Sequence, residues 1–275
     1  MTKTKRERVG CQAMQRHCGL LRRAVPGIVG SVLLLAATQV ARAQTDEIQV
    51  YNAQIAPVGV LNLTDHMNYT PDGRTTPDYP GGIVPDHSFN GGFEWAYGIT
   101  SWWEQGLYMP LYSLADGGAL TFNGFKVREL FVSPHAATRT FYYGLNFEFS
   151  YNTYHWSADR YDQEMRPILG WRFGPWDLIL NPILDNNYKG FRELDFAPAS
   201  RIDYNFNKTW AIAVEEYDDF GHLRGFNPAS QQQHTIFGKF DYSGSLWSVE
   251  GGVGMGMTAA SDKVVLQLWV SRDLN

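Results

Sequence analysis

The sequence predicts an all-β protein, a transmembrane up-and-down antiparallel β-barrel of about twelve strands. Three features predict it: residues that alternate between apolar and polar, segments mostly 11–14 residues long, and aromatic residues gathered at the ends of these segments. Period-two alternation gives a strand two different faces. The segments are longer than the ~5–6 residues usual in soluble sheets and long enough for a tilted strand to cross lipid.

The clearest alternation lies in residues 89–112, which read FNGGFEWAYGITSWWEQGLYMPLY. Phe93, Trp95 and Tyr97 fall on one face and Glu94 falls on the other. A short break at 100–102 separates this segment from a second alternating segment. The stretch therefore predicts a long β-hairpin.

Taken in order, the same alternation predicts twelve strands: 58–70, 88–99, 103–113, 122–133, 139–151, 163–173, 176–184, 193–206, 209–217, 232–243, 246–257 and 262–274. The connections between them alternate between long and tight. This pattern is typical of a barrel with loops at one end and short turns, together with both termini, at the other.

The first 43 residues have a different character. A basic stretch precedes the apolar run 25–40, and Ala41-Arg42-Ala43 follows. At about 16 residues the run is shorter than the roughly 20 of a spanning helix, so we expect a signal peptide at 1–43, cleaved before Gln44. An uncleaved anchor and a start at Met14 are the alternatives. We expect residues 44–57 to be a periplasmic segment or an extra strand, and 58–275 to be the barrel.

Charge and cysteine content exclude several functions. Eight of the 23 Lys and Arg and one of the 28 Asp and Glu lie in 1–43, so the remainder carries 15 basic and 27 acidic residues, a net charge of −12. An acidic exported chain argues against a nucleic-acid partner. Cys11 and Cys18 both lie in the predicted signal peptide, so the mature chain has no disulfide and no thiol nucleophile. We expect no cofactor.

No metal site is expected either. The histidines are scattered and form no HxxxH or HxxEH pair. The acidic run Glu215, Glu216, Asp218 and Asp219 has oxygen ligands for a divalent cation but lacks the spacing of a calcium loop, and a solvated acidic loop is the favoured interpretation.

The aromatic residues orient the faces of the barrel. The residues predicted to form a girdle near the tight turns are Trp102, Trp103, Phe173, Trp176, Phe206, Trp210, Tyr242 and Trp247. Amphipathic rings favour the membrane interface, so we expect the apolar face to contact outer-membrane lipid. A soluble periplasmic barrel or sandwich is the alternative. The barrel-assembly machinery is an expected partner, and the sequence leaves the oligomeric state open.

The opposite face would then line the lumen. Its predicted pore-lining residues are Glu94, Glu104, Lys126, Arg128, Glu148, Glu164, Arg166, Arg172, Asp195, Arg201, Asp203, Glu215 and Glu250, and Lys239 is expected on the same face. They suit either a narrow polar channel or a network of ion pairs that fills the barrel. Glu94 and Glu104 are expected on adjacent strands, where two like charges need a cation, a proton or a basic partner such as Arg128.

The segment EWAYGITSWWEQGLYMPL resembles a motif of Gram-negative outer-membrane proteins, in the porin-like family associated with phenol-degradation pathways and related exported barrels. The matching residues are Glu94, Tyr97, Gly98, Thr100, Glu104 and Pro110. The resemblance implies an outer-membrane barrel that admits small hydrophobic or aromatic compounds.

We therefore expect a bacterial outer-membrane channel or facilitator for small solutes. A structural barrel with a plugged lumen and loop-mediated contacts is the second hypothesis. A lipid-modifying enzyme is a third, less favoured one, because no Ser and His cluster forms a recognised catalytic pattern; no catalytic residue is assigned.

Overall fold

The computed structural model describes residues 48–275, so the predicted signal peptide lies outside the described residues. Its strands are β1 (Leu61–Asp72), β2 (Phe89–Thr100), β3 (Trp103–Leu114), β4 (Leu120–Val132), β5 (Phe141–Asn152), β6 (Tyr161–Phe173), β7 (Trp176–Asn181), β8 (Leu184–Asn186), β9 (Asp195–Phe196), β10 (Ala199–Asn205), β11 (Trp210–Asp219), β12 (Gln233–Ser243), β13 (Ser248–Gly256) and β14 (Val264–Asp273). Within the described residues, no helix has the length and apolar character needed to cross a membrane.

These segments form twelve barrel strands, because two of the predicted strands are interrupted. The predicted strand 176–184 is divided into β7 and β8 around Pro182, and the strand 193–206 into β9 and β10 around Pro198. Proline has no backbone N–H to donate to a ladder. Glu193, the first residue of the second predicted strand, belongs instead to the short 3-10 helix η1 (Phe191–Glu193).

The sheet closes on itself. β1 pairs with both β2 and β14, and β5 pairs with both β4 and β6, all antiparallel. With the remaining neighbours this completes a ring without a free edge. The predicted all-β antiparallel barrel of twelve strands is confirmed.

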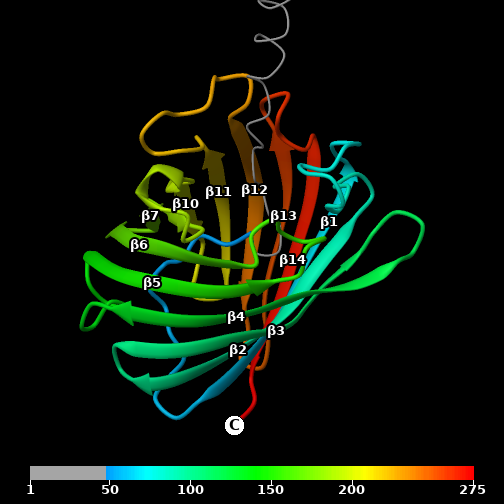
Figure 1. Cartoon of the computed structure of the whole chain (residues 1–275). Coiled ribbons are helices and arrows are strands. Elements are labelled where there is room, and N and C mark those ends of the chain that lie inside the picture. The colour runs from blue at the N-terminus through cyan, green and yellow to red at the C-terminus, as the bar shows by residue number, and fades with distance from the viewer. Residues whose placement is uncertain (1–47) are drawn as a thin grey trace, which may run out of the picture. The chain divides into compact units, whose positions relative to one another are not determined.

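Loop lengths differ between the two ends, as predicted. Only two residues separate β2 from β3 and β6 from β7, whereas residues 73–88 connect β1 to β2 and residues 220–232 connect β11 to β12. In Figure 1 the loop after β11 lies at the top and the C-terminus at the bottom. We call these the long-loop end and the tight-turn end.

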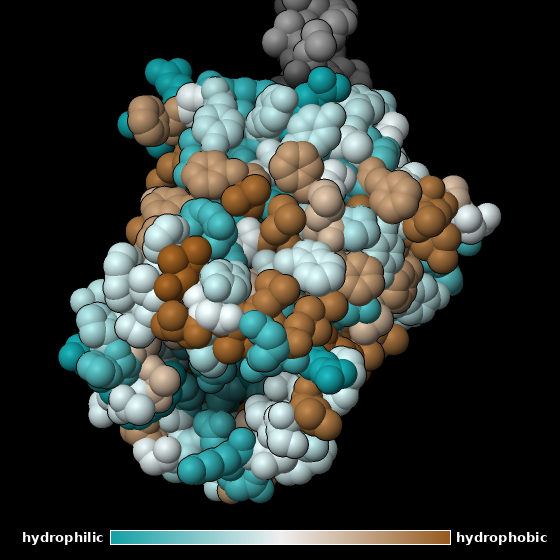
Figure 2. Space-filling model, turned by 90° about the horizontal axis from the view of Figure 1, so that it is seen from below, coloured by the Kyte–Doolittle hydropathy of each residue, from teal (hydrophilic) through white to brown (hydrophobic). Residues whose placement is uncertain are grey.

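The barrel wall is apolar outside and polar inside. On β11, Ile212 and Val214 are exposed on the outer face, while Glu215 on the lumen face is completely buried. A soluble barrel would place these side chains the other way round. Figure 2 shows hydrophobic side chains gathered on the outside of the barrel. This arrangement fits a barrel whose outer wall contacts lipid.

The predicted girdle residues lie around the tight turns. Six are exposed: Trp102, Phe173, Trp176, Phe206, Trp210 and Trp247. Trp103 and Tyr242 are half-buried, and Tyr242 contacts Trp210 with 4.8 Å between ring centroids. Their role as an interfacial girdle stays a prediction.

Candidate functional site

Most of the predicted pore-lining residues are buried inside the barrel. Those with little exposed surface are Glu94, Glu104, Lys126, Arg128, Glu148, Arg166, Arg201, Asp203, Glu215 and Glu250. Glu164, Arg172 and Asp195 are half-buried. Because inward residues recur every second position along each strand, the alternation in the sequence identifies them.

The first cluster of charges joins the hairpin of β2 and β3 to β4. Arg128 Nη2 lies 2.8 Å from Glu94 Oε1 and also donates to Glu104, so a single guanidinium bridges the two carboxylates. This is the basic partner that the sequence led us to expect. His66 on β1 adds a contact of 3.0 Å between its Nε2 and Glu94.

The second cluster lies across the lumen on β10–β13. Arg201 contacts four carboxylates: Asp203 at 2.6 Å, Glu250 at 2.7 Å, Glu215 and Asp241. Lys239 lies 2.5 Å from Glu215 and 2.7 Å from Glu250. Buried charges are tolerated when they are paired in this way. Lys239 is among the residues predicted for the lumen face, whereas Asp241 is not.

Two further basic residues of the lumen, Lys126 and Arg166, are also paired with carboxylates. Lys126 Nζ lies 3.6 Å from Glu148. Arg166 donates to both oxygens of Glu164, at 2.6 and 2.9 Å. Arg172, nearer the tight-turn end, pairs with Asp177 at 3.0 Å.

Residues 48–57 lie within the lumen, and we call them the luminal segment. For 44–57 the sequence predicts a periplasmic segment or an extra strand, but the structure assigns no strand within 48–57. Ile48, Val50, Tyr51 and Ala53 are buried. The segment lacks the alternation that would fit the wall, whereas its apolar side chains find an apolar patch inside the barrel.

Polar contacts hold the middle of the luminal segment. Asn181 of β7 accepts a hydrogen bond from the Tyr51 backbone N–H at 2.8 Å and donates to the Tyr51 carbonyl at 3.0 Å. The Tyr51 hydroxyl lies 2.8 Å from that of Tyr108 and donates to Glu148 at 3.2 Å. The guanidinium of Arg166 stands 4.6 Å from the centre of the Tyr51 ring.

Both ends of the luminal segment are also bound to charged lumen residues. The carbonyls of Ile48 and Gln49 accept from Lys239 at 3.2 Å and Arg166 at 2.8 Å. The backbone N–H of Ala56 donates to Glu104. The lumen charges therefore satisfy a buried backbone that has no strand partner.

The apolar patch under the luminal segment consists of inward-facing residues that break the polar pattern. Val50, Tyr51 and Ala53 pack in one cluster with residues from four strands: Leu130, Val132, Tyr142, Ile168 and Ile179. The sequence predicts a charged and polar lumen face. Ile168 and Ile179, each on the face of charged neighbours, are the sequence signal that could have indicated a segment inside the barrel.

The end of the luminal segment packs closely against the backbone of Gly98 in the barrel wall. A Cβ at this position would meet the carbonyl oxygens of Pro57 at 2.3 Å and Ala56 at 2.4 Å. The N–H of Gly59 donates to the Gly98 carbonyl at 2.8 Å. The motif that carries the family resemblance thus includes a glycine required by close backbone approach.

The acidic run 215–219 does not form a single cluster. β11 extends to Asp219, so these residues belong to a strand and not to a loop. Glu215 faces the lumen and Glu216 the exterior, because neighbouring residues of a strand point to opposite faces. Asp218 and Asp219 lie at the long-loop end of the lumen.

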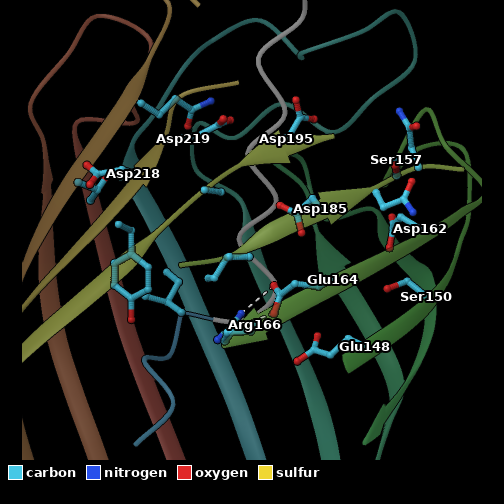
Figure 3. Close-up of a pocket in the computed structure, with 18 of the residues that line it drawn as sticks. Glu148, Ser150, Ser157, Asp162, Glu164, Arg166, Asp185, Asp195, Asp218 and Asp219 are labelled. Carbon is cyan, nitrogen blue, oxygen red and sulfur yellow. Dashed lines mark hydrogen bonds and ion pairs between the residues drawn. The ribbon is translucent and has the colours of Figure 1, made fainter. Parts of the chain in front are cut away.

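A cavity of about 250 Å³ occupies the lumen between the luminal segment and the long loops. Ile48 lies at its border, and strands β4, β5, β6, β8, β9, β11, β12 and β14 contribute side chains to it. Figure 3 shows Glu164 and Arg166 on neighbouring inward positions, with Asp185 and Asp162 facing the same space. Among the described residues, the segment 48–57 fills the inner part of the lumen, and the cavity lies between it and the long loops.

Comparison with known proteins shows similarity at the level of structure. No protein-family model and no curated protein matches the sequence. The COG4313 outer membrane channel from Pseudomonas putida F1 has a TM-score of 0.56 and 10% sequence identity, over 83% of this chain and 100% of that chain. The KdgM porin in complex with disordered oligogalacturonate has a TM-score of 0.49 and 13% identity, over 78% of this chain and 99% of that chain.

At 10% identity, the similarity to the COG4313 channel shows a shared fold. This shared fold, the closed ring of twelve strands and the apolar outer wall agree with the predicted location in the outer membrane. The chain has the fold of a bacterial outer-membrane β-barrel.

Proposed function

We propose that the protein is an outer-membrane channel or facilitator for small solutes, whose passage is controlled by the luminal segment 48–57. The observation that carries this proposal is the division of the lumen into an outer cavity and an inner half filled by that segment. A protein of the same fold is described as an outer membrane channel. The inward charges would provide a polar route for solutes once the segment moves.

Noncovalent contacts hold the luminal segment in place. They consist of one patch of apolar packing and hydrogen bonds such as those of Tyr51 and Asn181. Each hydrogen bond contributes about 0.5–1.5 kcal/mol net, and bonds to charged groups about 1.5–3. A segment held by several such contacts favours the occluded state and can still detach without unfolding the wall.

The second candidate is a structural barrel with a permanently plugged lumen. The pairing of Arg201, Lys239 and Arg128 with lumen carboxylates favours it. Under this hypothesis the long loops would be the functional surface.

Conductance in planar bilayers separates the two candidates. We expect small single-channel steps from the purified wild-type protein. A variant in which Tyr51 and Val50 are both replaced by Gly should give larger or more frequent steps, because these side chains anchor the segment. If neither protein conducts at any voltage, while both are folded as judged by heat-modifiable gel mobility, the channel hypothesis is wrong.

The identity of the solute belongs to the proposal as well. The resemblance around Glu94–Pro110 suggests small hydrophobic or aromatic compounds. Swelling of vesicles that contain the Tyr51 and Val50 double variant would compare phenol-sized neutral solutes with charged ones of equal size. If vesicles with and without the protein swell at the same rate in a given solute, that solute is not transported.

A further inference from the structure

We propose that a groove on the outer face of the barrel, near the long-loop end, binds a phosphorylated lipid of the outer leaflet, with its phosphate against Arg160 and Lys189 and an acyl chain along the aromatic side chains beside them. Those side chains are Phe149, Tyr161 and Tyr188, and we call the site the outer groove. Because the lipid would bind to the wall and not in the lumen, the inference goes beyond the proposed function and does not depend on transport.

The aromatic side chains of β5 and β6 in the groove belong to the outer face. On β5, Phe149 is exposed between the buried Glu148 and Ser150, so it points away from the lumen. Tyr161 of β6 is exposed and lies opposite Tyr151 in the register of the two strands. Residues directly opposite one another share a face of the sheet, and Tyr151 shares the face of Phe149. Figure 1 shows β5 and β6 side by side in the wall.

Two loops complete the outer groove at its upper edge. The Tyr188 hydroxyl donates to Gln163 Oε1 of β6 at 3.3 Å, which holds the loop after β8 beside the wall. In the same loop, Lys189 contacts Asp159, which precedes β6. The groove is therefore built from fixed elements on both sides.

The rings around the groove indicate its level in the membrane. Tyr151 lies 5.7 Å from Tyr161 and 5.6 Å from Phe125 of β4, measured between ring centroids. These rings continue across three strands close to their long-loop ends. Amphipathic rings favour the membrane interface, and the longer loops of outer-membrane barrels lie outside the cell. The groove is thus expected at the headgroup level of the outer leaflet.

Arg160 is the charge that lacks a partner within the protein. Its guanidinium is exposed and stands 5.9 Å from the centre of the Tyr151 ring, and it makes no ion pair or side-chain hydrogen bond among residues 48–275. The acids of the groove are already engaged: Asp159, with a side chain 5% exposed, contacts Lys189, and Asp162 accepts from Asn152 at 2.6 Å. The available charge at the groove is therefore positive.

This combination of features favours a phosphorylated lipid over other ligands. Arginine forms strong charge-assisted hydrogen bonds with phosphate. The side chain of Phe149, directly below, continues into the apolar outer wall that contacts lipid. A neutral aromatic solute would leave Arg160 without a partner, and a soluble acidic protein would have to displace lipid from the wall. An anionic headgroup with an attached acyl chain satisfies both parts of the groove.

Native mass spectrometry of the purified, folded protein in detergent, titrated with diphosphorylated lipid A, tests the inference. The comparison lipids are dephosphorylated lipid A with the same acyl chains and phosphatidylcholine, whose headgroup carries no net charge. All titrations use the same low ionic strength, because salt screens the interaction. We expect diphosphorylated lipid A to bind at least tenfold more tightly than either comparison lipid.

Arg160→Glu should weaken binding of diphosphorylated lipid A by about thirtyfold, since each unit of charge near a lipid surface contributes about fivefold. Arg139→Glu is the matched control, because Arg139 is also exposed but lies between β4 and β5 at the tight-turn end. It should leave binding unchanged. If Arg160→Glu loses heat-modifiable mobility, Arg160→Gln replaces it, with an expected loss of about fivefold.

A second substitution tests the apolar part of the groove. Phe149→Ala should weaken binding of phosphorylated and dephosphorylated lipid A by the same factor, about threefold, because it removes apolar contact area and no charge. Equal affinity for the two forms of lipid A, or equal weakening by the Arg160 and Arg139 substitutions, would overturn the inference. A barrel that conducts but shows no preference for phosphorylated lipid would leave the proposed channel intact and remove only this inference.

Discussion

Replacing Arg201 with Met should destabilise the barrel strongly. The guanidinium contacts Asp203, Glu215, Asp241 and Glu250, and Glu215 is completely buried. After the substitution, Lys239 is the remaining cation in contact with Glu215 and Glu250, so at least two carboxylates lose their basic partner. Removing one partner of a buried ion pair costs about 3–5 kcal/mol. We expect a loss of unfolding free energy in that range.

Urea unfolding of the protein in phospholipid vesicles, followed by tryptophan fluorescence, measures this loss. Arg192→Met is the control, because Arg192 is exposed in η1, and it should change stability by less than about 0.5 kcal/mol. Combining Arg201→Met with Asp241→Asn should recover part of the loss, since one unpaired charge is removed. If Arg201→Met unfolds like the control, the charges are hydrated by an open pore and the paired network is not structural.

Three further substitutions test other parts of the molecule. Tyr51→Phe removes the hydroxyl contacts with Tyr108 and Glu148 and should raise amide hydrogen exchange in the luminal segment, at a cost of about 1–2 kcal/mol; unchanged exchange would contradict these contacts. Asn181→Ala removes both hydrogen bonds between the Asn181 side chain and the Tyr51 backbone, so conductance should increase while heat-modifiable mobility persists. Val214→Arg places a charge on the exposed outer face of β11 and should destabilise the barrel in lipid by about 2–4 kcal/mol, whereas Val214→Leu should not; a tolerated arginine would refute lipid contact there.

The wall of the barrel could be predicted because its signal is local. Alternation over 139–151 places Glu148 inside and Phe149 outside, and β5 has that arrangement. Because side chains alternate between the two faces of a strand, assigning one residue to the lumen or the lipid side assigns all the others. The two interruptions also have local causes, Pro182 and Pro198, although alternation alone predicts continuous strands through both.

The contents of the lumen could not be predicted in the same way. The contact between Tyr51 and Asn181 joins residues 130 positions apart, and it depends on where a segment without alternation finds apolar surface. The cavity likewise combines side chains from strands that are distant in sequence, among them Asp185 and Gln233. Only the bridge from Arg128 to Glu94 and Glu104 was expected, because it joins adjacent strands.

The reactivity of cysteines placed in the luminal segment tests whether residues 48–57 pack inside the barrel. The chain from Gln44 onward contains no cysteine, so single substitutions report on one site each. Ala53 is 3% exposed, while the neighbouring Gln54 is exposed, and Cys is close to Ala in size. The two variants differ in burial and are adjacent in sequence.

Labelling with a membrane-impermeant maleimide would be timed on the folded barrel in vesicles and again after unfolding. A segment packed in the lumen predicts that Ala53→Cys reacts far more slowly than Gln54→Cys in the folded protein, and that the two react alike after unfolding. Equal and fast labelling of both variants in the folded protein would show that residues 48–57 lie outside the lumen, and would contradict the account.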